Sequence, residues 1–558
     1  MSSISAEAVP PEPAPDRRRG TAPLAQFFIP AAASLQERRP RTLKHGDTFA
    51  VFDHNGDAHE GLGSPEGLYH RDTRHLSRFY LTIDGARPML LSSTLRDDNA
   101  SLTSDLTNPD LYDEDGRLLV QHDVIHIRRS RFLWNATCFE RLGVRNFDHV
   151  PRQLRLEIAF AADFADIFEV RGTRREQRGT IHPPEIDGGR VTLSYTGLDN
   201  RRRQTSLVFD PVPAELTGHR AVFVVDVKPS ETCNIFIEIC CQDEPRVSGP
   251  RRNFFTALRA AHRALRLSSS RAASVATSNE IFNEAVRRSV SDINMLITDM
   301  PEGPYPYAGI PWFSTVFGRD GLITALEMLW LDPWLARGVL GHLAANQAEV
   351  LDPLADAEPG KILHEIRQGE MAELGEVPFR RYYGSVDSTP LFVLLAGAYL
   401  DRTGDLETLG RLWPNIKAAL AWIDNYGDRD GDGLVEYGRQ SKDGLINQGW
   451  KDSQDSVFHA DGSLAKGPIA LVEVQGYVYA AKRYAARMAR LMGLPERADA
   501  LERDAFLLRR RFDEAFWCED IGIYALALDG EKRPCRVRTS NAGHALFSGI
   551  ADPHRAER

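Results

Sequence analysis

The sequence predicts a multidomain β + α fold in which a β-sandwich precedes a helical domain. Between about residues 42 and 243, short runs alternate apolar with polar residues and are rich in β-branched and aromatic side chains. Gly, Asp, Asn and Pro separate these runs. Beyond residue 250, apolar residues recur at the three- and four-residue spacing of amphipathic helices. Many strands without intervening helices favour a sandwich over a parallel sheet.

The composition is that of a globular protein with a large core. The chain has 558 residues, of which 42% are hydrophobic and 26% charged. Its net charge of −10 does not suit a polyanion-binding surface, so nucleic acid is not an expected partner. No stretch reaches the length of a membrane span, so we expect no membrane contact. The six cysteines form no CxxC pair and the N-terminus lacks an apolar signal region, which predicts a cytoplasmic protein.

The first part of the chain is expected to form a tail and then the sandwich. Residues 1–22, rich in Ser, Pro and Arg, are predicted to be a disordered tail. The sandwich is expected to span residues 23–250. The alternating pattern predicts strands at residues 47–53, 78–84, 124–134, 153–160, 190–198, 205–210, 221–227 and 233–241.

The second part is expected to be helical almost throughout. Residues 251–275, dominated by Ala, Leu and Arg, predict a helical linker, and residues 276–558 a helical domain. Helices are predicted at residues 279–298, 318–330, 333–350, 388–401, 406–426, 470–492 and 496–516, with a last one around 541–550.

Four segments of the helical half combine aromatic with charged residues in loops. They are residues 311–321, 361–390, 447–456 and 472–477. Such a mixture suits a sugar, because a pyranose offers apolar faces for aromatic rings and hydroxyls that need paired donors and acceptors. Hydrolysis of a glycoside then needs two carboxyl groups, one protonated and one ionised.

The same segments carry a family resemblance. The resemblance rests on "WFSTVFGRDGLITALEML", "YYGSVDSTPLFVLL", "NQGWKDSQDSV" and "VEVQGYVYAA", which resemble the glucosidase domain of the bacterial glycogen-debranching (amylo-α-1,6-glucosidase-like) family. The first half contains "LKHGDTFAVFD", "GLYHRDTRHLSRFYLTIDG" and "LTNPDLYDEDG", which resemble the β-sandwich that precedes this domain. The resemblance covers about residues 22–558. It implies an (α/α)6 barrel, hydrolysis of α-glucosidic bonds with inversion, an α-glucan or small glucoside as substrate, and no cofactor.

The resemblance also implies the general acid. Asp452 of "GWKDS" matches the family's Trp-x-Asp acid, a position that needs a carboxyl protonated near neutral pH. Trp450 beside it is expected to form an apolar wall, and Lys451 to lie with it in the substrate site. Asp455 is a rival, because in a helical segment the two carboxyls share a face and repulsion raises one pKa. A plain loop role for the segment is a third interpretation.

Arg319 and Asp320 match the "GRD" that holds the terminal sugar in the resembled family. An ionised Asp accepts sugar hydroxyls and the neighbouring Arg fixes it. The alternative is that Asp320 caps a helix beginning at Gly321 and that Arg319 pairs with it.

Further residues are candidates for contact with the sugar. Asp387 is interpreted either as the N-cap of an apolar helix or as a ligand group beside Tyr382 and Tyr383. Glu473 lies on an otherwise apolar helix, where an unpaired carboxylate is costly, so we expect it in the site. The remaining candidates for the substrate pocket are Trp312, His364, Glu365 and Arg367.

No metal site is predicted. The segment "HEIRQ" (residues 364–368) begins like a zinc-protease helix, but Gln368 stands where the second His is required. The segment "DRDGDGLVEYGR" (residues 428–439) resembles a calcium-binding EF-hand loop, but Arg439 occupies the twelfth position, where a Glu belongs. A Gly-rich turn between helices is therefore favoured over a calcium site.

The sequence departs from the resembled family in its last part. The barrel has twelve helices and about eight are predicted, and the family's general base is a Glu that we expect beyond Arg558. The expectation is a C-terminally truncated hydrolase whose base lies in the missing part. The alternatives are a non-catalytic carbohydrate-binding protein and a hydrolase of a small α-glycoside.

Overall fold

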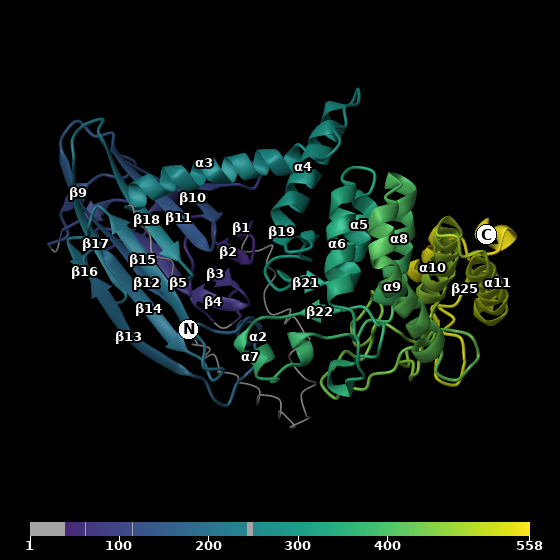
Figure 1. Cartoon of the computed structure of the whole chain (residues 1–558). Coiled ribbons are helices and arrows are strands. Elements are labelled where there is room, and N and C mark those ends of the chain that lie inside the picture. The colour runs from purple at the N-terminus through teal and green to yellow at the C-terminus, as the bar shows by residue number, and fades with distance from the viewer. Residues whose placement is uncertain (1–39, 62, 114, 243–248) are drawn as a thin grey trace, which may run out of the picture.

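The computed structural model describes residues 40–61, 63–113, 115–242 and 249–558. A β-rich part formed by the first half of the chain lies beside a helical part formed by the second half (Figure 1). The predicted order of a β domain followed by a helical domain is confirmed. The tail predicted for residues 1–22 lies outside the described residues.

The largest sheet of the described residues has eight antiparallel strands. Its central strands β18, β11 and β10 pair over most of their length. In spatial order the strands are β13 (Thr180–Asp187), β14 (Arg190–Thr196), β15 (Arg202–Asp210), β18 (Thr232–Cys240), β11 (Thr137–Asn146), β10 (Ile125–Trp134), β7 (Leu102–Thr107) and β6 (Met89–Leu95).

Two smaller sheets complete the β-sandwich in the described part of the chain. One contains β16 (Glu215–Leu216), β17 (Arg220–Val227), β12 (Arg152–Ala161) and β5 (Arg78–Ile83). The other contains β1 (Arg41–His45), β2 (Thr48–Phe52), β3 (Gly67–His70) and β4 (Thr73–Leu76). Side chains from all three sheets meet in one apolar core, including Phe52, Leu156 and Ile237. The short elements of this half are β8 (Leu111–Tyr112), β9 (Leu118–Val120) and α2 (Ile167–Val170).

Each of the eight predicted strands corresponds to an observed strand. The central strand β11 is not predicted, because Glu140 and Arg141 interrupt its apolar pattern. Glu140 is nevertheless buried: its two oxygens accept hydrogen bonds from Arg129 Nε at 2.7 Å and Arg131 Nε at 2.8 Å. Asp57 accepts a further bond from Arg129 at 2.5 Å. The pattern fails here because an ion-pair network, and not an apolar side chain, fills the interior.

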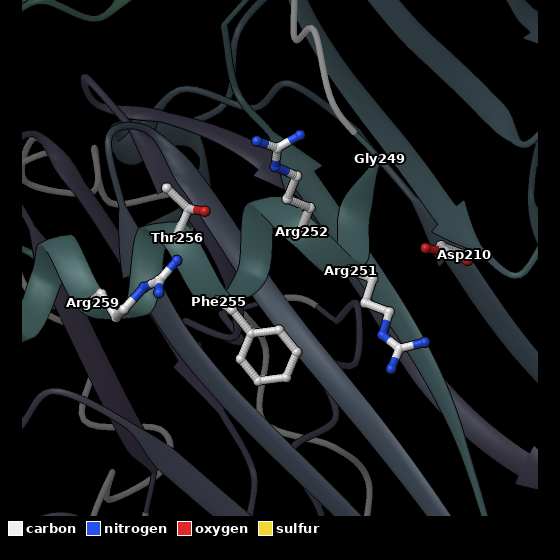
Figure 2. Close-up of a pocket in the computed structure, with 7 residues that line it drawn as sticks. All are labelled: Asp210, Gly249, Arg251, Arg252, Phe255, Thr256 and Arg259. Atoms are coloured by element: carbon white, nitrogen blue, oxygen red, sulfur yellow. The ribbon is translucent and has the colours of Figure 1, made fainter.

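A long helix connects the two parts. Helix α3 (Pro250–Ser269) lies along the larger sheet, and α4 (Glu280–Leu296) follows it (Figure 1). Phe254 of α3 packs against Phe132, Phe139 and Phe236 of the sheet. Figure 2 shows the first turns of α3, where arginine side chains and Asp210 line a hollow of about 460 Å³.

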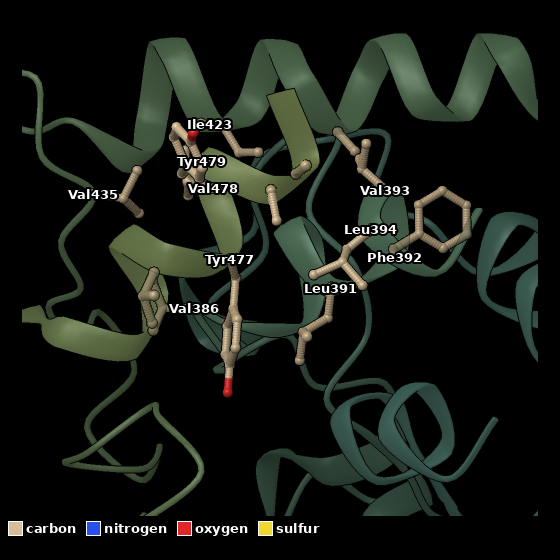
Figure 3. Close-up of a cluster of buried hydrophobic side chains, with 14 of the residues drawn as sticks. Val386, Leu391, Phe392, Val393, Leu394, Ile423, Val435, Tyr477, Val478 and Tyr479 are labelled. Carbon is tan, nitrogen blue, oxygen red and sulfur yellow. The ribbon is translucent and has the colours of Figure 1, made fainter. Parts of the chain in front are cut away.

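The helical part is built around one large apolar core. Helices α8, α9 and α10 contribute much of it, and Figure 3 shows Leu391, Phe392, Ile423 and Val478 packed together there. The helices are α5 (Gly318–Met328), α6 (Pro333–Ala345), α7 (Glu370–Glu373), α8 (Ser388–Thr403), α9 (Leu406–Trp422), α10 (Val472–Leu491), α11 (Pro495–Phe516), α12 (Gly543–Ser548) and α13 (Pro553–Ala556).

Short strands and turns of other helix types connect these helices. The strands are β19 (Ile297–Met300), β20 (Gly303–Pro306), β21 (Val316–Phe317), β22 (Glu365–Ile366), β23 (Ala470–Leu471), β24 (Trp517–Cys518), β25 (Ile523–Tyr524) and β26 (Ala527–Leu528). The 3₁₀ turns are η2 (Pro353–Ala355), η3 (Pro378–Arg380) and η5 (Ser540–Ala542), and η4 (Ile423–Gly427) is a π-turn.

The predicted helices are observed, with three differences in length. The helical linker predicted to reach residue 275 ends at Ser269 as helix α3. The helix predicted to reach residue 350 ends at Ala345, because Asn346 leaves helical geometry and its side chain donates to the carbonyl oxygen of His342. The helix predicted to reach residue 426 ends at Trp422 and continues as the π-turn η4. Among the helices of the described residues, none is long and apolar enough to cross a membrane.

Candidate active site

Arg319, in the first turn of α5, joins three segments that are distant in the sequence. Its Nη1 donates to the carbonyl oxygen of Gly449 at 2.6 Å and to Asp387 Oδ2 at 3.4 Å. Its Nη2 donates to Asp452 Oδ2 at 3.0 Å. The guanidinium is almost fully buried. Three of the four aromatic and charged segments found in the sequence therefore meet at one side chain.

Two glycines allow this close approach. A Cβ on Gly318 would lie 1.8 Å from the carbonyl oxygen of Leu363, and one on Gly449 would lie 2.3 Å from Leu471 Cδ1. At Gly318 the neighbour is backbone, so any larger residue would push α5 away from the 363–364 segment. At Gly449 the neighbour is the end of the Leu471 side chain, which would have to shift to admit a larger residue.

The first turn of α5 excludes one of the two interpretations of Asp320. The helix begins at Gly318 with Phe317 as N-cap, so the alternative that Asp320 caps a helix beginning at Gly321 is wrong. Asp320 lies inside the first turn, where the helix dipole favours negative charge. Burial raises the pKa of Asp320, Arg319 lowers it, and the charges of Asp387 and Asp452 raise it again.

Asp387 is fully buried at the start of α8. It occupies the N-cap position but makes no side-chain capping bond. Its Oδ1 accepts instead from Ser385 Oγ at 2.5 Å, and its Oδ2 from Arg319. Asp387 thus has the position of a cap, but its side chain pairs with Arg319, and its role as a ligand group stays a prediction. Tyr383 points elsewhere and donates to the carbonyl oxygen of Asn346 at 2.8 Å.

Three carboxylates surround one guanidinium at this point. Burial works to lower the pKa of Arg319, but Asp387, Asp320 and Asp452 raise it above its ordinary value. Arg319 therefore stays charged, and the formal charge of the cluster is negative when the three carboxyls are ionised. A ligand that brings hydroxyl donors suits such an acceptor-rich cluster.

The 449–456 segment is an irregular loop and not a helix. The helical arrangement that would place Asp452 and Asp455 on one face is therefore absent from this described segment. Asp452 pairs with Arg319 while 43% of its side chain stays exposed, whereas Asp455 is exposed on the surface. Ser456 Oγ donates to the carbonyl oxygen of Lys451 at 2.5 Å, and Asn447 Nδ2 to that of Ser453 at 2.7 Å. These bonds hold the loop in a defined shape.

Glu473 lies buried in the first turn of α10, with 1% of its surface exposed. Its Oε1 accepts from Asn541 Nδ2 at 3.1 Å, while its Oε2 has no hydrogen-bond partner among the described residues. Burial raises the pKa of Glu473 to about 7, against the lowering effect of the hydrogen bond from Asn541. With a pKa of about 7, the Glu473 carboxyl changes between its protonated and ionised forms near neutral pH.

The structure adds residues that are not predicted from the sequence. Tyr477 is buried in the helical core and shares a 2.7 Å hydrogen bond with His544 Nδ1, and the His544 ring lies 5.7 Å from that of Trp450. Lys451 Nζ donates to Ser540 Oγ at 3.0 Å. The signal in the sequence is the polar run "SNAGH" (residues 540–544), which leads into the short helix α12.

Trp312, Glu365 and Arg367 form a second buried group, next to the β-sandwich. Arg367 donates to Glu365 at 2.5 Å, to the carbonyl oxygen of Trp312 at 2.8 Å and to Asp72 at 2.9 Å. The Trp312 side chain packs in an apolar cluster with Phe49, Phe168 and Tyr382, among others. These three candidates contact each other and the sandwich.

His364 connects the two groups. It is buried and precedes Glu365, and its ring lies edge-on to Phe317. Burial, followed by the charges of Arg319, Lys361 and Arg367, lowers the pKa of His364 well below 6.5. His364 is therefore a neutral side chain near neutral pH.

The acidic turn at residues 428–432 holds a lysine. Carboxylate oxygens of Asp428, Asp430 and Asp432 lie within 4.8 Å of one another. Lys532 Nζ contacts Asp430 at 3.0 Å and Asp432 at 2.7 Å, and also pairs with Glu436. Asp428 accepts from two backbone amides of the turn. An internal ammonium group thus pairs with two of these three aspartates and with Glu436.

Two family descriptions match the chain. Residues 43–238 match the N-terminal domain of (some) glycogen debranching enzymes. Residues 317–558 match the mannosylglycerate hydrolase MGH1-like glycoside hydrolase domain. A search of the curated proteins finds no match. The predicted resemblance to a debranching-type N-terminal domain and to a glycoside hydrolase is confirmed.

Solved structures share the fold at low sequence identity. A putative kojibiose phosphorylase from the human microbiome aligns with a TM-score of 0.54 and 8% identity, covering 87% of this chain and 69% of the other. A bacterial glucoamylase solved with acarbose aligns with a TM-score of 0.55 and 12% identity, covering 92% of this chain and 75% of the other. The arrangement of a β domain and a helical domain is therefore shared with both.

Proposed function

Since the chain carries a debranching-type N-terminal domain and a glycoside hydrolase domain, we propose that it hydrolyses α-glucosidic bonds with inversion, as a debranching amylo-α-1,6-glucosidase does. The substrate is an α-glucan or a short glucoside. The observation that carries the proposal is the contact of Arg319 with Gly449, Asp387 and Asp452.

We assign the general acid to Asp452. Its carboxyl is anchored by Arg319 on one oxygen and is 43% exposed, so that a glycosidic oxygen can reach it. An acid of this kind donates its proton to the leaving oxygen as the bond to the sugar breaks. Inversion also requires a carboxylate base acting on a water, with the two carboxyls about 6.5–9.5 Å apart. Asp452 is assigned as the acid only, and not as this base.

The sugar itself is held by the residues around Arg319. Asp320 and Asp387 accept hydroxyl hydrogen bonds, and Trp450 offers an apolar face to the ring. Lys451 and the unpartnered Oε2 of Glu473 provide further polar contacts. A second set supports this group from the buried side and consists of Trp312, His364, Glu365 and Arg367. The Tyr383 hydroxyl is bonded instead to the carbonyl oxygen of Asn346.

The proposal includes the organisation of the chain. We propose a sandwich domain over residues 23–250, of which 23–39, 62, 114 and 243–248 lie outside the described residues, a linker over 251–275, and a contribution of residues 276–558 to an (α/α)6 barrel. The likeness in fold to a bacterial glucoamylase supports this arrangement. We place the protein in the cytoplasm, which agrees with the free thiols of the six cysteines.

The test compares two aspartates of the same loop. Asp452→Asn is expected to lower kcat on α-1,6- and α-1,4-linked glucosides by about 10²–10⁴-fold, as loss of a general acid does. Asp455→Asn, an exposed neighbour, is expected to leave kcat unchanged. Proton NMR of the fresh product reports the anomer and so tests inversion. Equal activity of Asp452→Asn and the native protein would overturn the assignment.

A hydrolase of a small α-glycoside is the second candidate. The description of the matched hydrolase domain names mannosylglycerate, a glycoside with a carboxylate. Lys451 beside Trp450 offers a cation suited to such a group. Product chromatography on branched glucan, linear oligosaccharides and mannosylglycerate separates the two functions. Calorimetric sugar binding without any product release would instead favour a non-catalytic carbohydrate-binding protein.

A further inference from the structure

A separate cavity lies at the junction of the β-sandwich and the helical part. Its volume is about 440 Å³, within the range of small-molecule sites. Its wall comes from the turn between β3 and β4, the start of β15, the end of β18 and the residue that follows Arg367. The lining residues are His70, Arg71, Thr73, His75, Arg201, Arg202, Arg203, Gln204, Cys241, Gln242 and Gln368.

The lining of this cavity is cationic. Four arginines contribute to it, and no carboxylate does among the lining side chains that the structure describes. Three of them (Arg71, Arg201 and Arg202) are at least half exposed, and Arg203 is more buried. Guanidinium groups bind phosphate through paired N–H donors, so several of them around one cavity favour an anion with several acceptor oxygens.

The carboxylates that pair with these arginines lie around the cavity and not in its lining. Arg201 pairs with Glu373 at 3.3 Å and Arg202 with Glu185 at 3.1 Å. Exposed pairs of this kind contribute little free energy, about 0–1 kcal/mol in general, and have no fixed geometry. A phosphate group can therefore share or replace the carboxylate at small cost.

The two histidines of the cavity contribute polarity and not charge. Burial lowers the pKa of His70 to about 4 and that of His75 to about 3. His70 Nδ1 lies 2.8 Å from Thr48 Oγ1 and His70 Nε2 lies 2.9 Å from the Gln242 amide nitrogen. Near neutral pH the positive charge of the cavity thus comes from the arginines.

The cavity is joined to the candidate active site by one turn. Arg71 and Asp72 both adopt left-handed backbone geometry, with φ of 48° and 60°. Arg71 lines the cavity, while Asp72 accepts hydrogen bonds from Arg367 and from the backbone amide of Gln368, each at 2.9 Å. Such φ values are uncommon for residues other than glycine.

We propose that this cavity binds a small phosphate monoester of a sugar, at a site distinct from the residues around Arg319. The phosphate contacts Arg201, Arg202 and Arg71, and the sugar hydroxyls contact the polar lining of Gln204, Gln242 and Gln368. The volume exceeds that of a free phosphate ion, which favours the ester. Because binding is measured without turnover, the proposal does not depend on the proposed hydrolase activity.

The test is calorimetric titration of the protein with glucose 6-phosphate, inorganic phosphate and glucose. We expect saturable binding of glucose 6-phosphate, weaker binding of inorganic phosphate and none of glucose. The double variant Arg201→Gln/Arg202→Gln is expected to weaken glucose 6-phosphate binding by about tenfold or more, since it removes two charge-assisted contacts. The variant Arg201→Lys/Arg202→Lys keeps the positive charge but loses the paired N–H donors of the guanidinium groups. Its affinity for glucose 6-phosphate is expected to lie between that of the native protein and that of the Gln double variant.

A second arginine-lined hollow provides the matched control. Arg252 and Arg259 of α3 lie in the hollow of Figure 2, which contains the carboxylate of Asp210. Arg252→Gln/Arg259→Gln removes the same charge and is expected to leave the affinity unchanged. The proposal is overturned if no phosphate compound binds up to about 10 mM, if inorganic phosphate alone binds, or if both double variants weaken binding equally. Circular dichroism of each variant verifies that the fold is retained.

Discussion

The β-sandwich and the helical part each contain an arginine–carboxylate network. The network in the sandwich is fully buried and paired (closed), whereas the network around Arg319 is partly exposed to solvent (open). In the sandwich, Glu140 accepts from Arg129 and Arg131 through both oxygens, and all three side chains are at most 2% exposed. In the helical part, Arg319 reaches Asp387 at only 3.4 Å, and 43% of Asp452 is exposed. The closed network satisfies its own charges, whereas the open one has acceptor oxygens that a ligand can use.

The difference teaches how to separate structural from functional charge clusters. A closed network left with one partner missing retains an uncompensated buried charge, which is strongly destabilising. An open network can lose one contact to solvent at lower cost, and its groups remain available to substrate. Variants of the closed network should therefore lose mainly stability, whereas variants of the open network should lose mainly activity.

The largest effect is expected in the closed network. Glu140→Gln removes the charge shared by Arg129 and Arg131 and should lower the free energy of unfolding by about 3–5 kcal/mol. Urea denaturation followed by circular dichroism measures it. Glu407→Gln, which removes an exposed partner of Arg411, is the control and should cost less than about 1 kcal/mol. Similar losses in both variants would contradict the distinction.

Glu473 should make stability depend on pH. Its pKa is raised from 4.5 to about 7 by burial, so its contribution to stability is fully present below about pH 4.5 and is lost as the pH rises through about 7. The loss is on the order of 3 kcal/mol. Glu473→Gln does not titrate, so its stability relative to the native protein should increase from pH 4.5 to pH 8. A pH-independent difference in thermal midpoint would argue against a buried, titrating Glu473.

Arg319→Lys tests the open network through activity. Lysine keeps the charge but cannot reach Gly449, Asp387 and Asp452 together, so kcat should fall by about 100-fold, as when one preorganised donor is lost. The free energy of unfolding should fall by less than in Glu140→Gln. If stability falls equally in both variants, then the cluster around Arg319 is a structural network like that of the sandwich.

The smallest effect is expected at the acidic turn. Lys532→Met removes the ammonium that pairs with Asp430, Asp432 and Glu436, and should cost about 1–2 kcal/mol at pH 7, because Glu436 is buried while the lysine is partly exposed. Thermal unfolding at pH 7 and at pH 3.5 measures it. The difference should shrink at pH 3.5, because burial raises the pKa of Glu436 above 4.5 and its carboxylate is protonated there. An unchanged difference would show that packing of the lysine stem, and not charge, stabilises the turn.

Strands and helices were predictable from the sequence where their apolar residues follow a regular local pattern. Period-two alternation found the strands that have one apolar face, such as β12 and β17, and helical spacing found α5 to α11 except for the one-turn helix α7. The pattern failed at β11, where the interior position is filled by Glu140 and two arginines. It also overestimated α6, because the side chain of Asn346 closes that helix before the apolar spacing ends.

The candidate site was predictable in composition but not in assembly. The motifs around Arg319, Asp387 and Asp452 indicated sugar chemistry, and the structure brings these three residues into contact. The partner of Glu473 was not predictable, because Asn541 follows it by 68 positions and no local pattern connects them. Likewise, Trp312 carries an aromatic ring typical of a sugar site, yet it packs against the sandwich.

The sequence by itself determined the order of a β domain and a helical domain, the elements within them and the glycoside hydrolase type, because alternation, helical spacing and short motifs are local properties. Tertiary structure alone decided which carboxylates share Arg319, that Glu473 lies buried beside Asn541, and that Lys532 fills the acidic turn. These features depend on burial and on contacts between distant segments, which set the pKa values and the exposure of each group only once the chain has folded.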